Sequence, residues 1–126
     1  TGAFILGAAG LLAGRQATTH WRYHELLTAF GAEPVKARVV RDGNLFTGGG
    51  VTAGIDFAFT VVVELAGETA AQAIQLGLEY DPHPPVDCGS PDKACVHVRG
   101  AVEQRFAPRV EAFEGLLRGM RATEAV

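Results

Sequence analysis

The stretch Val-Val-Arg-Asp-Gly-Asn-Leu-Phe-Thr-Gly-Gly-Gly-Val-Thr-Ala-Gly-Ile-Asp-Phe, residues 39–57, is the most informative part of the sequence for the fold. It begins inside a β-branched segment, residues 35–40, whose apolar side chains alternate with basic ones. This alternation predicts a half-exposed strand, and the turn residues at 42–44 lead into a short strand at 45–47. After three consecutive glycines, apolar residues at helical spacing predict a helix over residues 52–65.

The segment on the N-terminal side predicts a helix, a strand and a second helix. Residues 2–13 are small and apolar on nearly every face, which predicts a helix that is buried all round. Gly7 and Gly10 would let it pack closely against its neighbours. Residues 17–19 then predict a short strand, and residues 21–30 an amphipathic helix.

The segment on the C-terminal side predicts two more helices and a connector. Residues 68–80 are apolar at helical spacing after Gly67, which separates them from the preceding helix. Four prolines among residues 81–93 exclude a helix there and predict an extended connector. A last helix is expected from Ala107, with Pro108 in its first turn.

The alternation of helices and strands indicates an α/β layered fold, in which a sheet is covered by helices on both faces. About three strands can be counted, and so small a sheet would leave apolar helix faces uncovered. The chain also opens on Thr1, with an apolar helix and no strand before it. We therefore expect residues 1–126 to be the C-terminal portion of a single domain whose other strands precede Thr1.

Composition restricts the class of partner. The 126 residues carry a net charge of −3 with Lys and Arg scattered, which disfavours nucleic acid and anionic membrane surfaces. Residues 2–13 are too few to span a bilayer. Two cysteines, Cys88 and Cys95, cannot form a dense disulfide framework and favour a reduced, cytoplasmic setting. We expect a small-molecule substrate, no cofactor or metal, and a homodimer formed through the remaining apolar surface.

Three stretches carry a resemblance to a known family. Residues 1–3, Thr-Gly-Ala, open a glycine- and alanine-rich helix, and residues 17–21, Ala-Thr-Thr-His-Trp, follow at the distance usual in the ThiJ/PfpI superfamily. Residues 39–57 resemble a pattern shared by two of its branches, the isonitrile hydratases and the sensor domains of AraC-type transcription regulators. The resemblance implies a flavodoxin-like three-layer sandwich, like that of class I glutamine amidotransferases, with a cysteine nucleophile directly before Thr1.

The two branches imply different functions. A regulator should carry a helix-turn-helix domain after this core, whereas residues 107–126 are expected to form one helix. This favours the enzyme branch, a lyase that hydrates isonitriles to N-substituted formamides. The alternative is a small-molecule-sensing domain of an AraC-type regulator without catalysis, since one fold can serve both functions.

The resemblance also implies roles for the first residues. A thiol just before a helix has its pKa lowered by the helix dipole and the free N–H groups, which here would be those of Thr1 and Gly2. The Thr1 hydroxyl could orient the thiol, a water or the acid, which in this branch is a carboxylate from the missing N-terminal half. Alternatively, Thr1 only caps its helix. An N-terminal Thr nucleophile would require two facing antiparallel sheets, which the order of elements does not predict.

His20 and the glycines at 49 and 50 are candidates for the wall of a pocket. His20 lies where related members keep a His near the Cys, but it equally suits a structural role at a strand end. His20 and His24 could form a metal pair, yet no third ligand is evident. Gly49 and Gly50 lack the Lys of a phosphate loop, so we expect them to approach the helix at Gly2 or to shape the pocket wall.

Two further groups of polar residues have simple interpretations. Asp56 lies in an apolar helix, either as a buried carboxylate with a raised pKa or, more simply, paired with N–H groups or a hydroxyl at the helix start. The ligand-rich segment at residues 87–97 matches no zinc spacing, so free thiols are expected there.

Overall fold

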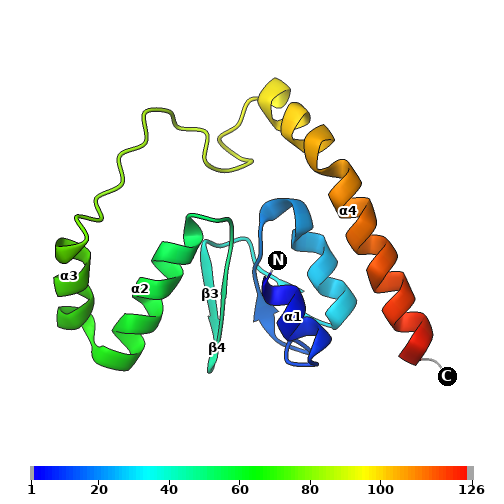
Figure 1. Ribbon diagram of the computed structural model, residues 1–126, viewed down its shortest axis with the longest axis horizontal. Helices are drawn as coiled ribbons and strands as arrows, with labels where there is room; N and C mark the ends of the chain where they lie inside the picture. Colours follow the sequence, from blue (N-terminus) through cyan, green and yellow to red (C-terminus); the bar gives the residue numbers. More distant parts are fainter. Residues whose placement is uncertain (1, 125–126) are drawn as a thin grey trace. The chain divides into compact units, whose positions relative to one another are not determined.

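The computed structural model describes residues 2–124 of the chain, with side chains placed up to residue 120. The chain divides into two units, residues 1–85 and residues 86–126, each held by its own contacts. The expected mixture of helices and strands is confirmed (Figure 1). The elements are α1 (Gly2–Ala8), β1 (Gln16–Ala17), η1 (Trp21–Phe30), β2 (Glu33–Pro34), β3 (Val39–Asp42), β4 (Leu45–Gly48), α2 (Ala53–Ala66), α3 (Glu68–Gly77) and α4 (Val96–Glu124).

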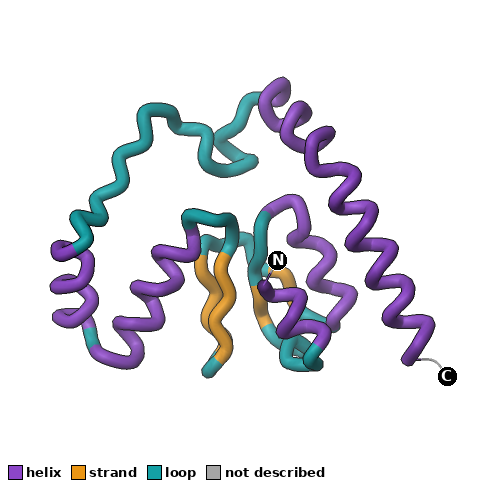
Figure 2. The backbone as a smooth tube through the Cα atoms, viewed as in Figure 1, coloured by secondary structure: helices purple, strands orange, loops and turns teal. Residues whose placement is uncertain are grey.

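The strands of the first unit form two small sheets. β1 and β2 pair in parallel, with Gln16 opposite Glu33, and η1 connects them as a 3-10 helix. β3 and β4 form the expected antiparallel hairpin, with Asp42 opposite Leu45 around Gly43, whose φ is 61° (Figure 2). A left-handed residue at this position is typical of a tight hairpin turn.

The strand expected over residues 35–40 begins only at Val39, and four short strands replace the approximately three expected. The backbone changes sheets in this segment. The N–H of Val35 still donates to the Ala17 carbonyl of β1, whereas the carbonyl of Arg38 already accepts from Gly49 beyond β4. Alternation of apolar and polar residues cannot reveal such a change of partner, because both sheets require the same period of two.

α1 ends at Ala8 instead of residue 13, because Gly10 adopts a left-handed backbone with φ 74°. Gly7 packs as expected, directly against the ring of Phe30, but a Cβ on Gly10 would meet nothing within 4 Å. The prediction of a helix buried all round is wrong for the chain as described, since Ile5 is 75% exposed. The core lies instead between α1, η1 and β1, where the largest fully buried side chains are Leu12, Leu27 and Thr18.

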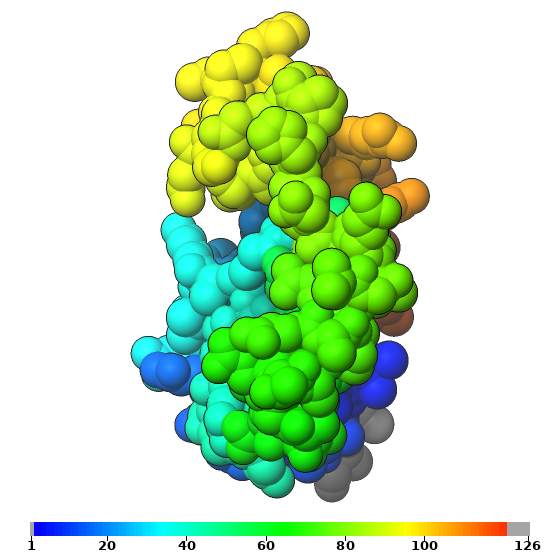
Figure 3. Space-filling view, turned by 90° about the vertical axis from the view of Figure 1, so that its left-hand side faces the viewer, coloured from blue at the N-terminus to red at the C-terminus, as the bar shows by residue number. Residues whose placement is uncertain are grey.

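The remaining helices of the first unit are confirmed with shifted ends. Gly67, with φ 84°, separates α2 from α3, and the two helices pack on each other. α3 ends at Gly77, before the expected Tyr80. Leu65 of α2 and Leu76 of α3 are exposed, and Figure 3 views the molecule from the side on which α3, in green, faces the reader.

The second unit contains α4, which begins at Val96 and not near Ala107. Pro108 therefore lies inside the helix instead of in its first turn, which corrects the expected helix start. Val98, Val102 and Phe106 are spaced four apart and would have revealed the additional turns. Although α4 is long, no helix among residues 2–124 is both long and apolar enough to cross a membrane. The expected connector before it contains no helix or strand over residues 81–93.

Candidate active site

His20 lies just beyond the carboxyl end of β1 and caps the start of η1. Its Nδ1 accepts a hydrogen bond from the backbone N–H of Arg22 at 3.2 Å. Ligands of open α/β sheets bind beyond the carboxyl ends of their strands, so this is a position from which a side chain can reach a substrate. The capping bond shows that His20 has a structural role, which was one of the two roles considered for it from the sequence.

Aromatic rings connect His20 to the first turn of α1. The His20 ring lies 5.8 Å from that of Tyr23, and Tyr23 meets Phe4 of α1 edge to face at 6.3 Å and 87°. The ring of Trp21 also stacks on that of His20, with the two ring centres 5.9 Å apart and the planes tilted by 28°. Phe4 and Tyr23 are buried. We call Phe4, His20, Trp21 and Tyr23 the His20 cluster, and it joins the beginning of α1 to the end of β1.

The two expected pocket glycines approach this cluster from the loop after β4. A Cβ on Gly50 would lie 3.7 Å from Cδ2 of His20, so Gly50 lies beside the imidazole and a side chain there would contact it. The N–H of Gly49 donates to the Arg38 carbonyl at 2.9 Å, and a Cβ on Gly49 would lie 3.5 Å from that oxygen. The nearest neighbours of Gly49 are Ala37, Arg38 and Ala53, and that of Gly50 is His20, so neither glycine has α1 as its nearest neighbour, and their place in a pocket wall stays a prediction.

Two buried threonines fix the hairpin to β1 and so hold the glycine loop near His20. The backbone N–H of Thr18 donates to the Thr47 hydroxyl at 2.9 Å, and the Thr18 hydroxyl donates to the Ala37 carbonyl at 3.1 Å. Thr18 is 1% and Thr47 3% exposed. Buried polar groups are costly unless paired, so these bonds define one register between the two sheets.

The hairpin turn makes a second attachment at the other end of β1. The Asp42 carboxylate accepts from the Gln16 backbone N–H at 2.8 Å and from Nη1 of Arg15 at 3.2 Å. Nη2 of Arg15 donates to the Asn44 side chain at 3.2 Å. The Asp-Gly-Asn turn, recognised in the sequence as a turn, therefore also anchors the hairpin.

Burial lowers the pKa of His20 from its ordinary value of 6.5, and nearby positive charge, including the Arg22 guanidinium, lowers it further. A neutral imidazole can donate from one ring nitrogen and accept at the other. Because Nδ1 already accepts from Arg22, its proton belongs on Nε2, where the ring can offer a donor.

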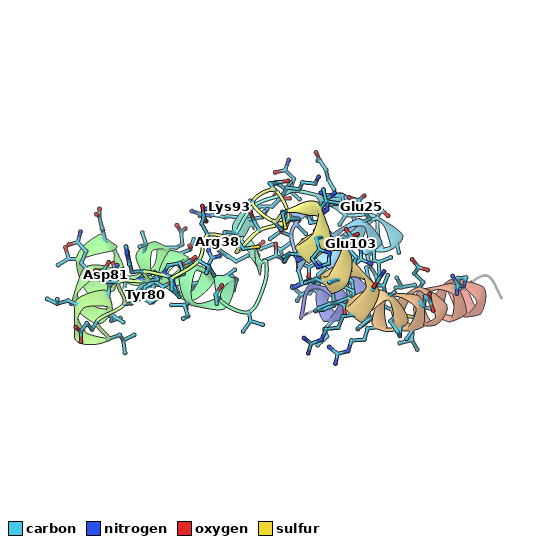
Figure 4. The ribbon with its side chains drawn as sticks, turned by 90° about the horizontal axis from the view of Figure 1, so that it is seen from above. Glu25, Arg38, Tyr80, Asp81, Lys93 and Glu103 are labelled. Atoms are coloured by element: carbon cyan, nitrogen blue, oxygen red, sulfur yellow. The ribbon has the colours of Figure 1, made fainter. Side chains whose placement is uncertain are left out.

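Asp56 is the centre of a polar group that the sequence did not reveal. Its carboxylate accepts from Nε of Arg38 and, at 2.7 Å, from the Tyr80 hydroxyl, whose ring stacks on Phe59 at 5.4 Å. Arg38 also donates to the Thr52 hydroxyl at 3.2 Å. Figure 4 labels Arg38 and Tyr80, which come from the segments before and after α2 and α3 in the chain.

The first of the two interpretations of Asp56, a buried carboxylate with a raised pKa, is wrong. Burial acts to raise the pKa of the carboxyl, but the hydrogen bonds from Arg38 and Tyr80 and the charge of Arg38 together hold it below the ordinary value of 3.8. The same contact with Asp56 raises the pKa of the Tyr80 hydroxyl. The capping role is also corrected, because both partners are side chains from other segments. Residues 18 and 24 positions away along the chain cannot be identified by helical spacing.

None of the other candidate residues that the structure describes belongs to the His20 cluster. Gly2 is exposed at the start of α1, and Thr1 lies outside the described residues. His24 is buried, and neither ring nitrogen has a hydrogen-bond partner within the described chain. Cys88 and Cys95 are free, exposed thiols. No group of three or more His, Cys, Asp or Glu side chains among residues 2–120 is arranged to hold a metal ion.

Isonitrile hydratase and a transcriptional regulator are among the proteins that are similar to more than half of this chain. Isonitrile hydratase from Pseudomonas putida is 61% identical over 111 residues, which cover 88% of this chain and 49% of the hydratase. The HTH-type transcriptional regulator GlxA of Rhizobium meliloti is 40% identical over 76 residues, which cover 59% of this chain and 24% of the regulator.

A solved structure has the same fold. The crystal structure of a ThiJ/PfpI family protein from Pseudomonas syringae superposes with a TM-score of 0.89 at 49% identity, covering 92% of this chain and 48% of that one. The chain thus spans about half the length of this protein and of the hydratase. Residues 1–64, which include α1, the His20 cluster, the hairpin and most of α2, match the DJ-1/PfpI family. The chain therefore belongs to the DJ-1/PfpI family.

Proposed function

We propose that this chain is the C-terminal part of a single domain that hydrates isonitriles to N-substituted formamides. The observation that carries the proposal is the 61% identity to an isonitrile hydratase over 88% of the chain. The aromatic contacts that lead from Phe4 in the first turn of α1 through Tyr23 to His20 support it, because they bring a helix N-terminus and a titratable ring into one cluster. A helix N-terminus favours an anion such as a thiolate.

The proposed reaction adds water across the isonitrile in two steps. A cysteine thiolate directly before Thr1 attacks the terminal carbon of R–N≡C, and an acid protonates that carbon, which gives the thioimidate Cys–S–CH=N–R. Water then adds to the same carbon, and the C–S bond breaks. The products are R–NH–CHO and the regenerated thiol, so one isonitrile and one water yield one formamide. The acid in this proposal is a carboxylate from a segment outside this chain.

Thr1 is the proposed catalytic residue of this chain, since its hydroxyl would lie beside the sulfur and could orient the thiol, a water or the acid. Gly2 would contribute its backbone N–H at the start of α1. In the whole protein, Thr1→Val should lose most formamide production while the thermal unfolding midpoint stays within about 2 °C, as for a surface change. Full activity of Thr1→Val would end the catalytic role and leave helix capping as its function.

Peptide mapping of the whole protein tests the central requirement of the mechanism. A residue other than Cys before Thr1 would remove the nucleophile and with it the hydratase proposal. If Cys is present, formamide formed from a simple alkyl isonitrile can be followed by its carbonyl infrared band, with the Cys→Ser variant as control.

The alternative function is a small-molecule-sensing domain, and the 40% identity to a transcriptional regulator favours it as the second candidate. The two functions differ in turnover. A sensor would bind a small molecule in an equimolar ratio and leave it unchanged, whereas the hydratase would consume many equivalents of isonitrile per protein chain.

A further inference from the structure

Arg38 joins the glycine loop to α2 through both its backbone and its side chain. Its carbonyl accepts from the N–H of Gly49 at 2.9 Å, and its guanidinium donates to Thr52 and Asp56. Gly50, the next residue of the loop, lies beside His20, since a Cβ on it would be 3.7 Å from Cδ2 of the imidazole. One residue therefore holds the loop on one side and the first turn of the following helix on the other.

Asp56 completes the attachment by binding a third segment. One carboxylate oxygen accepts from Arg38, and the other accepts from Tyr80 beyond α3. Asp56 is therefore held from two sides, which restricts the first turn of α2 more than a single ion pair would. The Gly50 carbonyl accepts from the N–H of Ala53 at 2.9 Å. A displacement of the first turn of α2 should therefore also displace Gly50, which lies beside His20.

We infer that Arg38 and Asp56 are positioning residues, which hold the Gly49–Gly50 loop against His20 and so fix one wall of the site. The inference rests on the proposed function for its kinetic consequence, but not for its structural one. A misplacement of about 1 Å in a catalytic wall can cost on the order of 10²-fold in rate, so even a partial loosening should be measurable.

The chain offers a matched control for this pair. Arg41 of β3, three residues after Arg38, forms a two-pronged ion pair with Glu64 at the opposite end of α2. Arg38 is 54% and Arg41 50% exposed as side chains, so the two pairs are similarly solvated. Only the first pair contacts the loop that reaches His20.

The chain also offers a probe of the wall that does not depend on catalysis. Trp21, the single tryptophan of this sequence, stacks on His20, and a protonated imidazole quenches indole fluorescence. A pH titration of this fluorescence therefore reports the protonation midpoint of His20. The whole protein is used, and a Trp21→Phe variant identifies the contribution of this residue to the signal.

The experiment compares Arg38→Gln, Asp56→Asn and the control Arg41→Gln. The first two variants should raise the His20 midpoint toward 6.5, because a loosened wall admits water to the ring. They should also lower kcat/KM for an alkyl isonitrile about tenfold. Arg41→Gln should leave the midpoint unchanged and kcat/KM within about twofold, because a surface ion pair contributes little elsewhere. Arg38→Lys, which keeps the charge but lacks the planar fork of donors, should be intermediate.

Equal effects of Arg38→Gln and Arg41→Gln on the midpoint would overturn the inference and leave both pairs with a general role in stability. If Arg38→Gln does not fold, the comparison of Arg38→Lys and Asp56→Asn with Arg41→Gln decides in the same way. Failure of the proposed function is recognised separately. In that case the unsubstituted protein makes no formamide, while the fluorescence midpoints still test the positioning role.

Discussion

Gly7 of α1 and Phe30 of η1 are in direct contact, since a Cβ on Gly7 would lie within 2.7 Å of both Cδ atoms of the Phe30 ring. We therefore expect Gly7→Ala to destabilise the protein by about 1–3 kcal/mol, as overpacking of a close contact does. Gly54 of α2 has open space at its Cβ position, so Gly54→Ala should instead stabilise by about 0.5–1 kcal/mol. Urea unfolding of both variants checks the opposite signs, and a stabilised Gly7→Ala would contradict the packing.

Thr47→Val should be strongly destabilising although the side chain keeps its size. The substitution removes the acceptor of the buried Thr18 N–H, and an unpaired buried donor costs about 1–3 kcal/mol. Thr28→Val is the control, because the Thr28 hydroxyl bonds at an exposed position. Thermal unfolding of the two variants should differ by several degrees. Equal midpoints would show that Thr47 does not hold the hairpin in place.

Asp42→Ala should lower the free energy of unfolding by about 1 kcal/mol, less than a fully buried charged hydrogen bond because the site is partly exposed. The change removes the acceptor for the Gln16 N–H and the partner of Arg15. Asp87→Ala, which removes a highly exposed partner of Lys93, should change stability by less than about 0.5 kcal/mol. Guanidinium chloride titration measures both, and similar losses would exclude a special anchoring role of the hairpin turn.

The lowered pKa of His20 makes stability depend on pH in one direction. Above pH 6.5 the ring is neutral in the folded and unfolded states, and its full contribution is present. As the pH falls from 6.5 through the lower folded pKa, the unfolded chain binds a proton before the folded one does, so stability decreases. The unfolding midpoint of the unsubstituted protein should therefore fall between pH 7 and 5 more steeply than that of His20→Gln. Parallel curves would refute the pKa shift, because the other three histidines are common to both proteins.

The sequence predicted those features whose signal lies within a few neighbouring residues. The hairpin follows from Asp42-Gly43-Asn44 between β-branched segments, and the close packing of Gly7 follows from small residues in an apolar helix. Gly50 and His20, both expected at a pocket wall, lie close together, and the pocket wall itself stays a prediction. The assignment to the ThiJ/PfpI superfamily is confirmed over residues 1–64.

The features that the sequence did not predict depend on residues far apart in the chain or on a choice between two local signals. Arg38 and Tyr80 reach Asp56 from other segments, and their hydrogen bonds reverse the direction expected for its pKa. Pro108 was interpreted as the start of a helix, but α4 accepts it at the cost of one backbone hydrogen bond. Gly10 was interpreted as a packing residue, whereas its left-handed backbone ends the apolar helix early.

The β1–β2 pair beside His20 and the attachment of the hairpin to β1 differ in how far apart their paired residues lie in the sequence. Gln16 and Glu33, which pair β1 with β2 on either side of η1, are 17 positions apart, whereas Thr18 and Thr47 are 29 apart. Closing the shorter segment costs less entropy, and local contacts form faster during folding. During synthesis from the N-terminus, β1, His20 and β2 also emerge from the ribosome before the hairpin does. The nascent chain therefore passes through a stage in which the imidazole has emerged and the glycine loop that lies beside it in the folded protein is still inside the ribosome.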